Sequence, residues 1–201
     1  MKQIYSTFDK QQIAKLPVVS FPGKIVTIVS EEEAKKAVSY LLRQDVLGFD
    51  TETKPNFKAG QQNTVALLQV SSRDICFLFR LNQIGLPRCL LRLLSDSGNT
   101  KVALSWHDDV RMLQQRVKFI PGTFIELQDM VGEYGIMDKS LQKLYANIFG
   151  EKINKSQRLS NWEADVLSPR QQLYAATDAW ACLMLYEELL WMKHDGYEII
   201  E

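Results

Sequence analysis

The sequence predicts an α/β domain in which helices cover both faces of a mixed β-sheet. Three short runs of β-forming apolar residues follow one another between residues 46 and 79, and polar, loop-forming stretches separate them. After residue 87, apolar runs alternate with stretches of helical periodicity, as in folds with parallel strands. The 201-residue chain is 46% hydrophobic, which suffices for one core, and its composition indicates no second domain. We therefore expect an N-terminal extension over residues 1–24 and a single domain over residues 25–201.

The N-terminal segment has a weak pattern. Residues 1–16 are polar and stop before a proline, which predicts a short helical or irregular extension. Two β-forming runs follow at residues 18–21 and 25–29, with Pro22 and Gly23 between them. This arrangement predicts either one interrupted strand or a tight hairpin.

A helix and the central strand come next. Ser30 and Glu33 have the spacing of a capping box, and apolar residues then recur every three or four positions. We therefore expect an amphipathic helix over residues 31–43. The run at residues 46–53 is rich in β-formers, is too short for an average helix and is followed by Pro55. It is interpreted as a buried strand.

The next two strands form a predicted hairpin. Residues 65–70 and 75–79 are apolar, and the four polar residues from Ser71 to Asp74 lie between them. Together with the strand over residues 46–53, they predict a three-stranded antiparallel meander.

The second half alternates helices with strands. The expected elements are a helix over residues 87–94, a buried strand over 101–106, a helix that Asp108 or Asp109 caps, and a last strand over 124–127. These two strands bring the predicted sheet to five.

Everything beyond residue 127 is predicted to be helical. Ser140 caps one expected helix, which Gly150 ends. Ser168, Pro169 and Gln171 are a strong start signal for a longer helix that reaches about residue 193.

Two acids end the central strand. Side chains alternate between the faces of a strand, so Asp50 and Glu52 are expected to share one face. Two adjacent carboxylates repel each other and are costly to desolvate, and a divalent cation between them would offset both effects. The alternative is a polar strand end that runs into a loop.

Two further acids occupy similar positions. Asp109 follows a strand, where α/β folds place their sites, although it could simply be a helix cap. Tyr174 and Asp178 lie one turn apart on the last helix, separated by small residues that allow close approach to the sheet. Asp178 could instead pair with a basic residue, and Tyr174 could be a core aromatic. Taken together with Asp50 and Glu52, these acids favour a metal site.

The charges are balanced, with 24 basic and 24 acidic residues. The chain therefore has no global positive field to hold a polyanion, and a nucleic acid would need a local basic lining or a bound metal. A set of basic residues precedes or begins the last helix: Lys152, Lys155, Arg158 and Arg170. This set suits a phosphate track, or equally a solvated face.

Cysteine usage and hydropathy bear on location. The three cysteines are scattered, which indicates neither a disulfide framework nor a zinc site and fits a reducing compartment. The longest apolar stretch, residues 179–192, is interrupted by two glutamates and is too short to span a bilayer. We expect a cytoplasmic protein with no membrane partner.

Three segments together resemble the motifs of the DEDD superfamily of 3′→5′ exonucleases. They are Phe49-Asp50-Thr51-Glu52, the stretch from Lys101 to Leu113 that contains His107-Asp108-Asp109, and Tyr174-Ala175-Ala176-Thr177-Asp178-Ala179. The stretches Ser140-Leu141-Gln142-Lys143-Leu144 and Ser160-Asn161-Trp162 are most similar to the ribonuclease D and Werner-syndrome exonuclease branch. The resemblance covers about residues 25–192, and the ordered set of motifs is specific where each motif alone is weak.

This resemblance implies a ribonuclease H-like fold with a mixed five-stranded sheet. It also implies a 3′→5′ exonuclease that releases nucleoside 5′-monophosphates from single-stranded 3′ ends of DNA or RNA. The tyrosine (DEDDy) type is indicated because Tyr174 precedes the last acid, and Leu173 stands where the other type has histidine. The alternative is a nuclease-fold protein that binds nucleic acid without cleaving it.

The family resemblance further implies roles for the site residues. Two divalent ions, Mg²⁺ or Mn²⁺, are expected as cofactors, and Asp50 would contact both. Glu52 and Asp178 would complete the site that holds the attacking water, and Tyr174 would orient that water.

Asp109 would support the second ion. It is preferred to Asp108 because family members have an apolar residue four positions after this acid, and Leu113 fills that position. The candidate substrate-binding residues are Thr51, Phe57, Trp106, Lys155 and Arg158, of which the two aromatic residues could equally belong to the core.

Overall fold

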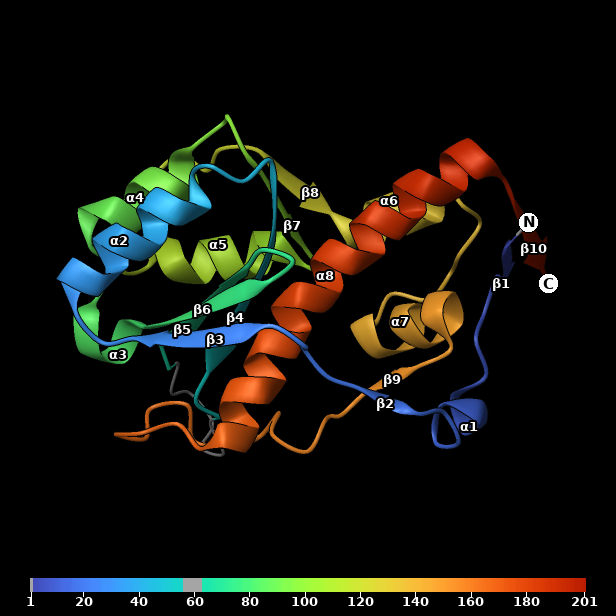
Figure 1. The fold of residues 1–201 in the computed structure, drawn as a ribbon, viewed down its shortest axis with the longest axis horizontal. Coiled ribbons are helices and arrows are strands. Elements are labelled where there is room, and N and C mark those ends of the chain that lie inside the picture. The colour runs from blue at the N-terminus through green and yellow to red at the C-terminus, as the bar shows by residue number, and fades with distance from the viewer. Residues whose placement is uncertain (1, 56–62) are drawn as a thin grey trace.

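The computed structural model describes residues 2–55 and 63–201. Its centre is a mixed sheet of six strands in the order β3-β6-β5-β4-β7-β8 (Figure 1). The strands are β3 (Lys24–Ile28), β4 (Val46–Thr53), β5 (Val65–Ser71), β6 (Ile75–Arg80), β7 (Thr100–Ala103) and β8 (Phe124–Glu126). The predicted α/β class and the antiparallel meander of β4, β5 and β6 are confirmed, whereas the predicted number of five strands is one too low.

The additional strand is β3, which lies parallel to β6 with Ile25 opposite Cys76. Neither alternative predicted for residues 18–21 and 25–29, one interrupted strand or a tight hairpin, is correct, because Val18–Val19 and Lys24–Ile28 belong to different sheets. Gly23 lies so close to the β5–β6 turn that an added Cβ would be 2.3 Å from the carbonyl oxygen of Asp74. The backbone nitrogen of Lys24 donates to the same oxygen at 2.8 Å. Glycine therefore brings the chain onto the sheet edge rather than turning it back on itself.

Helices cover both faces of the sheet, as predicted. α2, α4 and α5 lie over one face, and the long helix α8 crosses the other (Figure 1). The helices are α1 (Lys10–Ile13), α2 (Glu31–Leu41), α3 (Leu81–Ile84), α4 (Arg88–Ser95), α5 (Trp106–Gln114), α6 (Leu127–Gly132), α7 (Leu141–Phe149) and α8 (Pro169–Asp195). The capping boxes predicted at Ser30 and Ser168 are both formed. Within residues 2–55 and 63–201, no helix is both long and apolar enough to cross a membrane.

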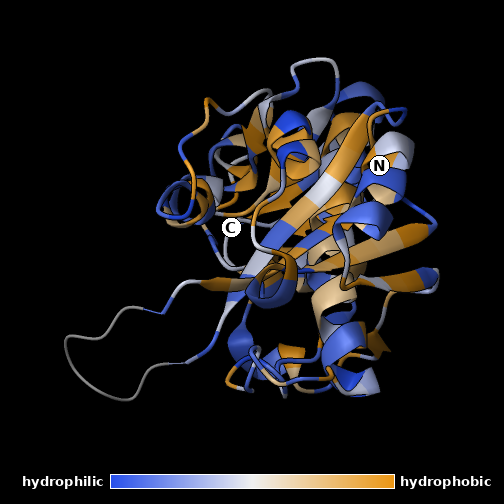
Figure 2. Cartoon of the chain, turned by 90° about the vertical axis from the view of Figure 1, so that its left-hand side faces the viewer, coloured by the Kyte–Doolittle hydropathy of each residue, from blue (hydrophilic) through white to orange (hydrophobic). Residues whose placement is uncertain are grey.

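The sheet separates two hydrophobic clusters. Leu68 and Phe79 pack with α2 and α4, while the adjacent Leu67 and Leu78 pack with α8. This division follows from the alternation of side chains along each strand. In Figure 2 the strands inside the molecule are coloured as apolar, whereas much of the outer helical surface is coloured as polar.

Helix α8 lies unusually close to the central strand. A Cβ added at Gly48 of β4 would be 1.9 Å from the carbonyl oxygen of Ala179, so only glycine fits there. Ala175 and Ala176, one turn earlier on α8, are also fully buried. The approach predicted from the small residues of this helix is therefore confirmed, and it brings Asp178 beside β4.

Two short parallel ribbons join distant parts of the chain (Figure 1). β1 (Lys2–Tyr5) pairs with β10 (Tyr197–Ile200), and β2 (Val18–Val19) pairs with β9 (Lys152–Ile153). The prediction that residues 1–16 are helical or irregular is therefore wrong for Lys2–Tyr5, and the prediction that everything beyond residue 127 is helical is wrong for β9 and β10. The division into residues 1–24 and 25–201 stays a prediction.

Candidate active site

Three carboxylates converge at the end of the central strand. Asp50 and Glu52 are two residues apart on β4, and Asp178 approaches them from α8. One oxygen atom from each of the three carboxylates lies within 4.8 Å of the other two. Asp50 and Glu52 are half-buried and Asp178 is buried. The acids that the sequence analysis grouped are thus neighbours in the fold.

A hydrogen bond from Thr51 connects Asp109 to the strand that carries Asp50 and Glu52. Asp109 lies in the first turn of α5, and the hydroxyl Oγ1 of Thr51 donates a hydrogen bond of 2.5 Å to its Oδ1. The adjacent Asp108 is exposed and pairs with Arg111 at 3.1 Å. The structure therefore places Asp109 beside the acids and Asp108 in solvent.

The start of α5 depends on Glu126, a residue that the sequence analysis did not single out. Its carboxylate accepts hydrogen bonds from the backbone nitrogens of Ser105 at 2.8 Å and Trp106 at 3.0 Å. Ser105 has a φ of 65°, so the chain turns sharply between β7 and α5. The strand predicted over residues 101–106 accordingly ends at Ala103, and the predicted aspartate cap is wrong. The sequence signal that could have pointed to Glu126 was its position as an acid at the end of an apolar strand.

The acids raise one another's pKa values. Burial raises the pKa of Asp50 to about 8, and the charge of Asp178 adds to this effect. Burial also raises the pKa of Glu52, with further contributions from Asp50, Asp178 and Asp109. The pKa of Asp109 is raised by burial and by Asp50, against the hydrogen bond from Thr51. Each carboxylate is hard to ionise first because it is buried, and for Asp50, Glu52 and Asp109 also because charged carboxylates are near. A bound cation would oppose both effects.

Tyr174 lies one helical turn before Asp178. Burial raises the pKa of Asp178 to about 7, and the nearby Tyr174 hydroxyl opposes this shift. Burial raises the pKa of Tyr174 itself far above its usual value, and the charge of Asp178 adds to this. The Tyr174 ring packs against the fully buried ring of Trp162, with centroids 5.9 Å apart.

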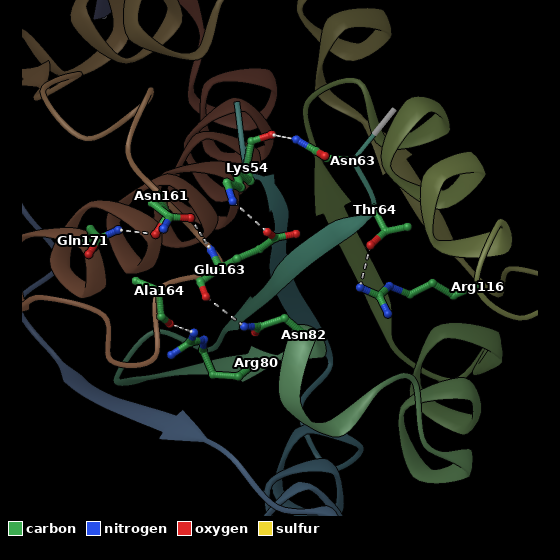
Figure 3. Close-up of polar contacts among 10 residues, drawn as sticks. All are labelled: Lys54, Asn63, Thr64, Arg80, Asn82, Arg116, Asn161, Glu163, Ala164 and Gln171. Atoms are coloured by element: carbon green, nitrogen blue, oxygen red, sulfur yellow. Dashed lines mark hydrogen bonds and ion pairs between the residues drawn. The ribbon is translucent and has the colours of Figure 1, made fainter. Parts of the chain in front are cut away.

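The segment that contains Trp162 is held from several sides (Figure 3). The contacts are hydrogen bonds from Arg80 to the carbonyl oxygens of Ala164 and Asp165, one of 3.2 Å from Gln171 to that of Asn161, and an ion pair of 3.2 Å between Lys54 and Glu163. Arg80 is itself buried at the end of β6. These contacts fix Trp162, and through it they fix the ring of Tyr174.

A cavity of about 200 Å³ opens onto the acids. Asp50, Tyr174 and Asp178 line it, together with Lys155 and Arg158. The charge of Lys155 lowers the pKa of Asp178, and that of Arg158 lowers the pKa of Glu52. Two of the predicted substrate-binding residues therefore lie at the acidic site.

The other predicted substrate-binding residues are in different surroundings. Thr51 is engaged with Asp109. The half-buried Trp106 stacks on Phe124 with centroids 5.0 Å apart and packs against the hydrophobic cluster under α2 and α4. This environment favours the core role that was the alternative for Trp106. Phe57 lies outside the described residues.

The donor set suits a divalent cation. Carboxylate oxygens are the ligands that Mg²⁺ and Mn²⁺ prefer. Mg²⁺ holds oxygen ligands at about 2.1 Å in an octahedron. The oxygens of Asp50, Glu52 and Asp178 lie within 4.8 Å of one another, so these side chains would have to draw closer together to bind one ion.

A mixed sheet with helices on both faces and an acidic cluster at the end of its central strand is typical of a ribonuclease H-like nuclease domain. Residues 25–192 match the model of the 3′-5′ exonuclease family, and the chain belongs to that family. The resemblance to the DEDD exonucleases is therefore confirmed.

Two curated relatives show the same similarity. The chain is 33% identical over 184 residues to the bifunctional 3′-5′ exonuclease/ATP-dependent helicase WRN of Mus musculus, which covers 87% of this chain and 13% of that protein. It is 35% identical over 148 residues to exonuclease 3′-5′ domain-containing protein 2 of Drosophila melanogaster, covering 72% of this chain and 25% of that protein. The chain thus matches a quarter or less of the length of these two relatives.

Solved structures share the fold at lower sequence identity. The EXO domain of Aedes aegypti Nibbler has a TM-score of 0.80 at 21% identity, covering 90% of this chain and 95% of that one. Escherichia coli RNase D has a TM-score of 0.76 at 20% identity, covering 85% and 45%. Trypanosoma brucei RNase D in complex with RNA U12 has a TM-score of 0.73 at 20% identity, covering 85% and 63%. These structures confirm the ribonuclease H-like fold.

Proposed function

We propose that the protein is an active, metal-dependent 3′→5′ exonuclease of the tyrosine (DEDDy) type. It hydrolyses phosphodiester bonds at single-stranded 3′ ends and releases nucleoside 5′-monophosphates. The observation that carries this proposal is the convergence of Asp50, Glu52 and Asp178, with Asp109 joined to the strand between them through Thr51. A non-catalytic protein of this fold would have no need of so costly a cluster of acids.

The cofactors are two divalent ions, Mg²⁺ or Mn²⁺. When bound, they supply an activated water and stabilise the leaving oxygen of the phosphodiester. By resemblance to the family, Asp50 would contact both ions, and its carboxylate lies within 4.8 Å of those of Glu52 and Asp178. Glu52 and Asp178 would complete one ion site, and Asp109 would support the other.

Tyr174 orients the attacking water. Its pKa is raised by burial and by Asp178, so the phenol keeps its proton at neutral pH and acts as a hydrogen-bonding group rather than as a base. Its contact with Asp178 and its packing on Trp162 hold the hydroxyl at the acidic cavity.

Lys155 and Arg158 bind the phosphates of the substrate at the mouth of the same cavity. Because the chain has no net charge, local positive charges such as these are needed to attract the phosphates of a nucleic acid. The substrate is DNA or RNA, and the complex of Trypanosoma brucei RNase D with RNA is one related case. Thr51 and Phe57 stay candidate contacts to the terminal nucleotide, whereas the packing of Trp106 on Phe124 favours a core role.

The test uses single-stranded DNA and RNA oligonucleotides with a 5′ label, incubated with Mg²⁺, Mn²⁺ or EDTA. We expect metal-dependent, stepwise shortening that keeps the 5′ label, while a circular single strand without an end stays intact. Asp178→Asn, made in the same background, should remove the activity. If either oligonucleotide binds but neither is shortened with any metal, the chain is a binding protein of nuclease fold and the proposal fails.

A further inference from the structure

A second, larger cavity lies on the other side of Tyr174 from the acids. It has a volume of about 470 Å³ and is bounded by the first turns of α8, the β2–β9 ribbon and the segment after β9. Tyr174 and Ile153 line both cavities, so the two are neighbours across these side chains. The volume lies within the range of about 300–1,000 Å³ that is usual for small-molecule sites.

One wall of this cavity comes from the N-terminal segment. Val18, Val19 and Ser20 line it, and all three precede residue 25, where the match to the exonuclease family begins. The cavity is therefore built partly by residues that the family match does not include.

The N-terminal wall is firmly attached. The backbone nitrogen of Phe21 donates to Oγ1 of Thr177 on α8 at 3.0 Å, and the Phe21 ring lies 6.0 Å from that of Trp180. Val18 and Val19 pair with Lys152 and Ile153 in the β2–β9 ribbon. Because both walls are fixed to secondary structure, the cavity is already formed in the absence of a ligand.

The lining has the chemistry of a nucleotide site. Apolar side chains form one part, and the amides of Asn154 and Gln157 offer donors and acceptors to a base edge. Among the described residues that line the cavity, Arg170 alone is charged. It is exposed and forms no ion pair with the residues in 2–55 and 63–201. A ligand with an aromatic base and one phosphate fits this combination.

We propose that this cavity binds a second nucleotide of the substrate strand, next to the one whose phosphate lies at the acids. The base lies against the apolar wall that includes Val18 and Leu173, and its phosphate is bound by Arg170. The proposal rests on the exonuclease function proposed above. It adds that the N-terminal segment takes part in holding the strand.

The test measures binding without hydrolysis. A 5′-fluorescein single-stranded octanucleotide is titrated in EDTA, and its fluorescence anisotropy is followed for wild type, Arg170→Gln and Val18→Trp. Arg170→Gln removes the charge, and Val18→Trp fills the cavity from an exposed position on β2. The matched controls are Arg88→Gln, an exposed arginine in the first turn of α4, and Val29→Trp, an exposed valine that follows β3.

We expect each cavity variant to weaken binding of the octanucleotide at least about fivefold, because Arg170→Gln removes the phosphate contact and Val18→Trp occupies the place of the base. For Arg170→Gln, the slope of log K against log salt should also fall by about 0.7, the value for one phosphate contact on a single strand. The two controls should bind like wild type. If the cavity variants bind as tightly as the controls, the proposal is wrong.

A second titration distinguishes between two possible occupants of the cavity, the substrate strand and a free mononucleotide product. Nucleoside 5′-monophosphates are titrated calorimetrically into the same proteins, and the variants should change their affinity much less than that of the octanucleotide. An equal loss for the mononucleotide would assign the cavity to free mononucleotides and overturn the strand assignment. Hydrolysis by the wild type is measured separately with metal, so a failure of this binding proposal leaves the proposed function standing and is distinguished from a failure of hydrolysis.

Discussion

The hydroxyl of Thr51 and the carboxylate of Asp109 are joined by a hydrogen bond of 2.5 Å between Oγ1 and Oδ1. Thr51 stands between Asp50 and Glu52 on β4, so this bond attaches the start of α5 to the strand that holds the acidic pair. It also distinguishes Asp109 from its neighbour Asp108, which is exposed and pairs with Arg111. Two adjacent aspartates therefore have opposite surroundings.

The first prediction compares these two aspartates. Asp109→Asn should lower kcat/KM of oligonucleotide hydrolysis about 100-fold, because it removes a charge that supports the metal site. Asp108→Asn should stay within about twofold of wild type, as expected for an exposed charge. Initial rates on the 5′-labelled substrate decide the matter. The reverse order would show that Asp108 is the metal-linked acid.

The second prediction concerns Thr51. Thr51→Val keeps the shape of the side chain but removes the hydroxyl that orients Asp109, so Mn²⁺ affinity should fall about tenfold. Thr51→Ser keeps the hydroxyl and should bind Mn²⁺ nearly as wild type does. Calorimetric titration of Mn²⁺ measures both. Equal affinities for the two variants would mean that the hydrogen bond does not position Asp109.

The third prediction concerns Glu126. Glu126→Ala leaves the backbone nitrogens of Ser105 and Trp106 without their acceptor, and should lower the free energy of unfolding by at least about 2 kcal/mol. Glu126→Gln keeps one acceptor oxygen and should cost less. Urea denaturation followed by circular dichroism compares them. A Glu126→Ala protein as stable as wild type would show that the start of α5 is held by other contacts.

The acids were accessible to sequence reasoning because each lies in a regular element. Alternation along a strand places Asp50 and Glu52 on one face, and helical spacing places Tyr174 one turn from Asp178. The small residues of α8 likewise predicted its close approach to β4. Periodicity predicts which face of a strand or helix a side chain occupies. Here these acids lie on the facing sides of β4 and α8, so this information was sufficient to predict that they meet.

The features that could not be predicted from the sequence depend on contacts between distant segments. The role of Glu126 arises only once β8 lies beside β7, and the left-handed turn at Ser105 has no glycine to signal it. The β2–β9 ribbon has two residues in each strand, too few for any alternation to be detected. Local patterns predicted the sheet and its acids, whereas the N-terminal wall of the larger cavity required tertiary structure.

The fourth prediction is a pH dependence of the metal-free protein. Burial raises the pKa of Asp50 to about 8 and that of Asp178 to about 7 in the folded state, against an ordinary value of 3.8. Between about pH 4 and pH 8 the folded protein therefore binds more protons than the unfolded chain. The stability that these groups contribute is fully present below about pH 4 and is lost as the pH rises through 7 and 8. For each extra proton that the folded state binds, the free energy of unfolding falls by about 1.4 kcal/mol per unit rise in pH.

Urea denaturation in EDTA at several pH values between 5 and 8 measures this slope. Asp50→Asn removes one of the interacting acids. The free energy of unfolding should therefore fall less steeply with pH, by about the 1.4 kcal/mol per pH unit that one proton contributes. Asp108→Asn is the control, since its exposed carboxylate lies outside the cluster, and it should leave the slope unchanged. A wild-type slope equal to that of Asp50→Asn would contradict the shared pocket of negative charge.

The central claim is that the acids form a metal site organised by Asp50. Thermal melts of wild type and Asp50→Ala over a Mn²⁺ titration test it most directly. Metal that binds only the folded state should stabilise the wild type by RT ln(1 + [L]/Kd), about 2.7 kcal/mol at a hundred times the dissociation constant. Asp50→Ala should stay folded and show almost none of this gain. Equal shifts of the melting temperature in the two proteins would place the metal elsewhere and contradict the account.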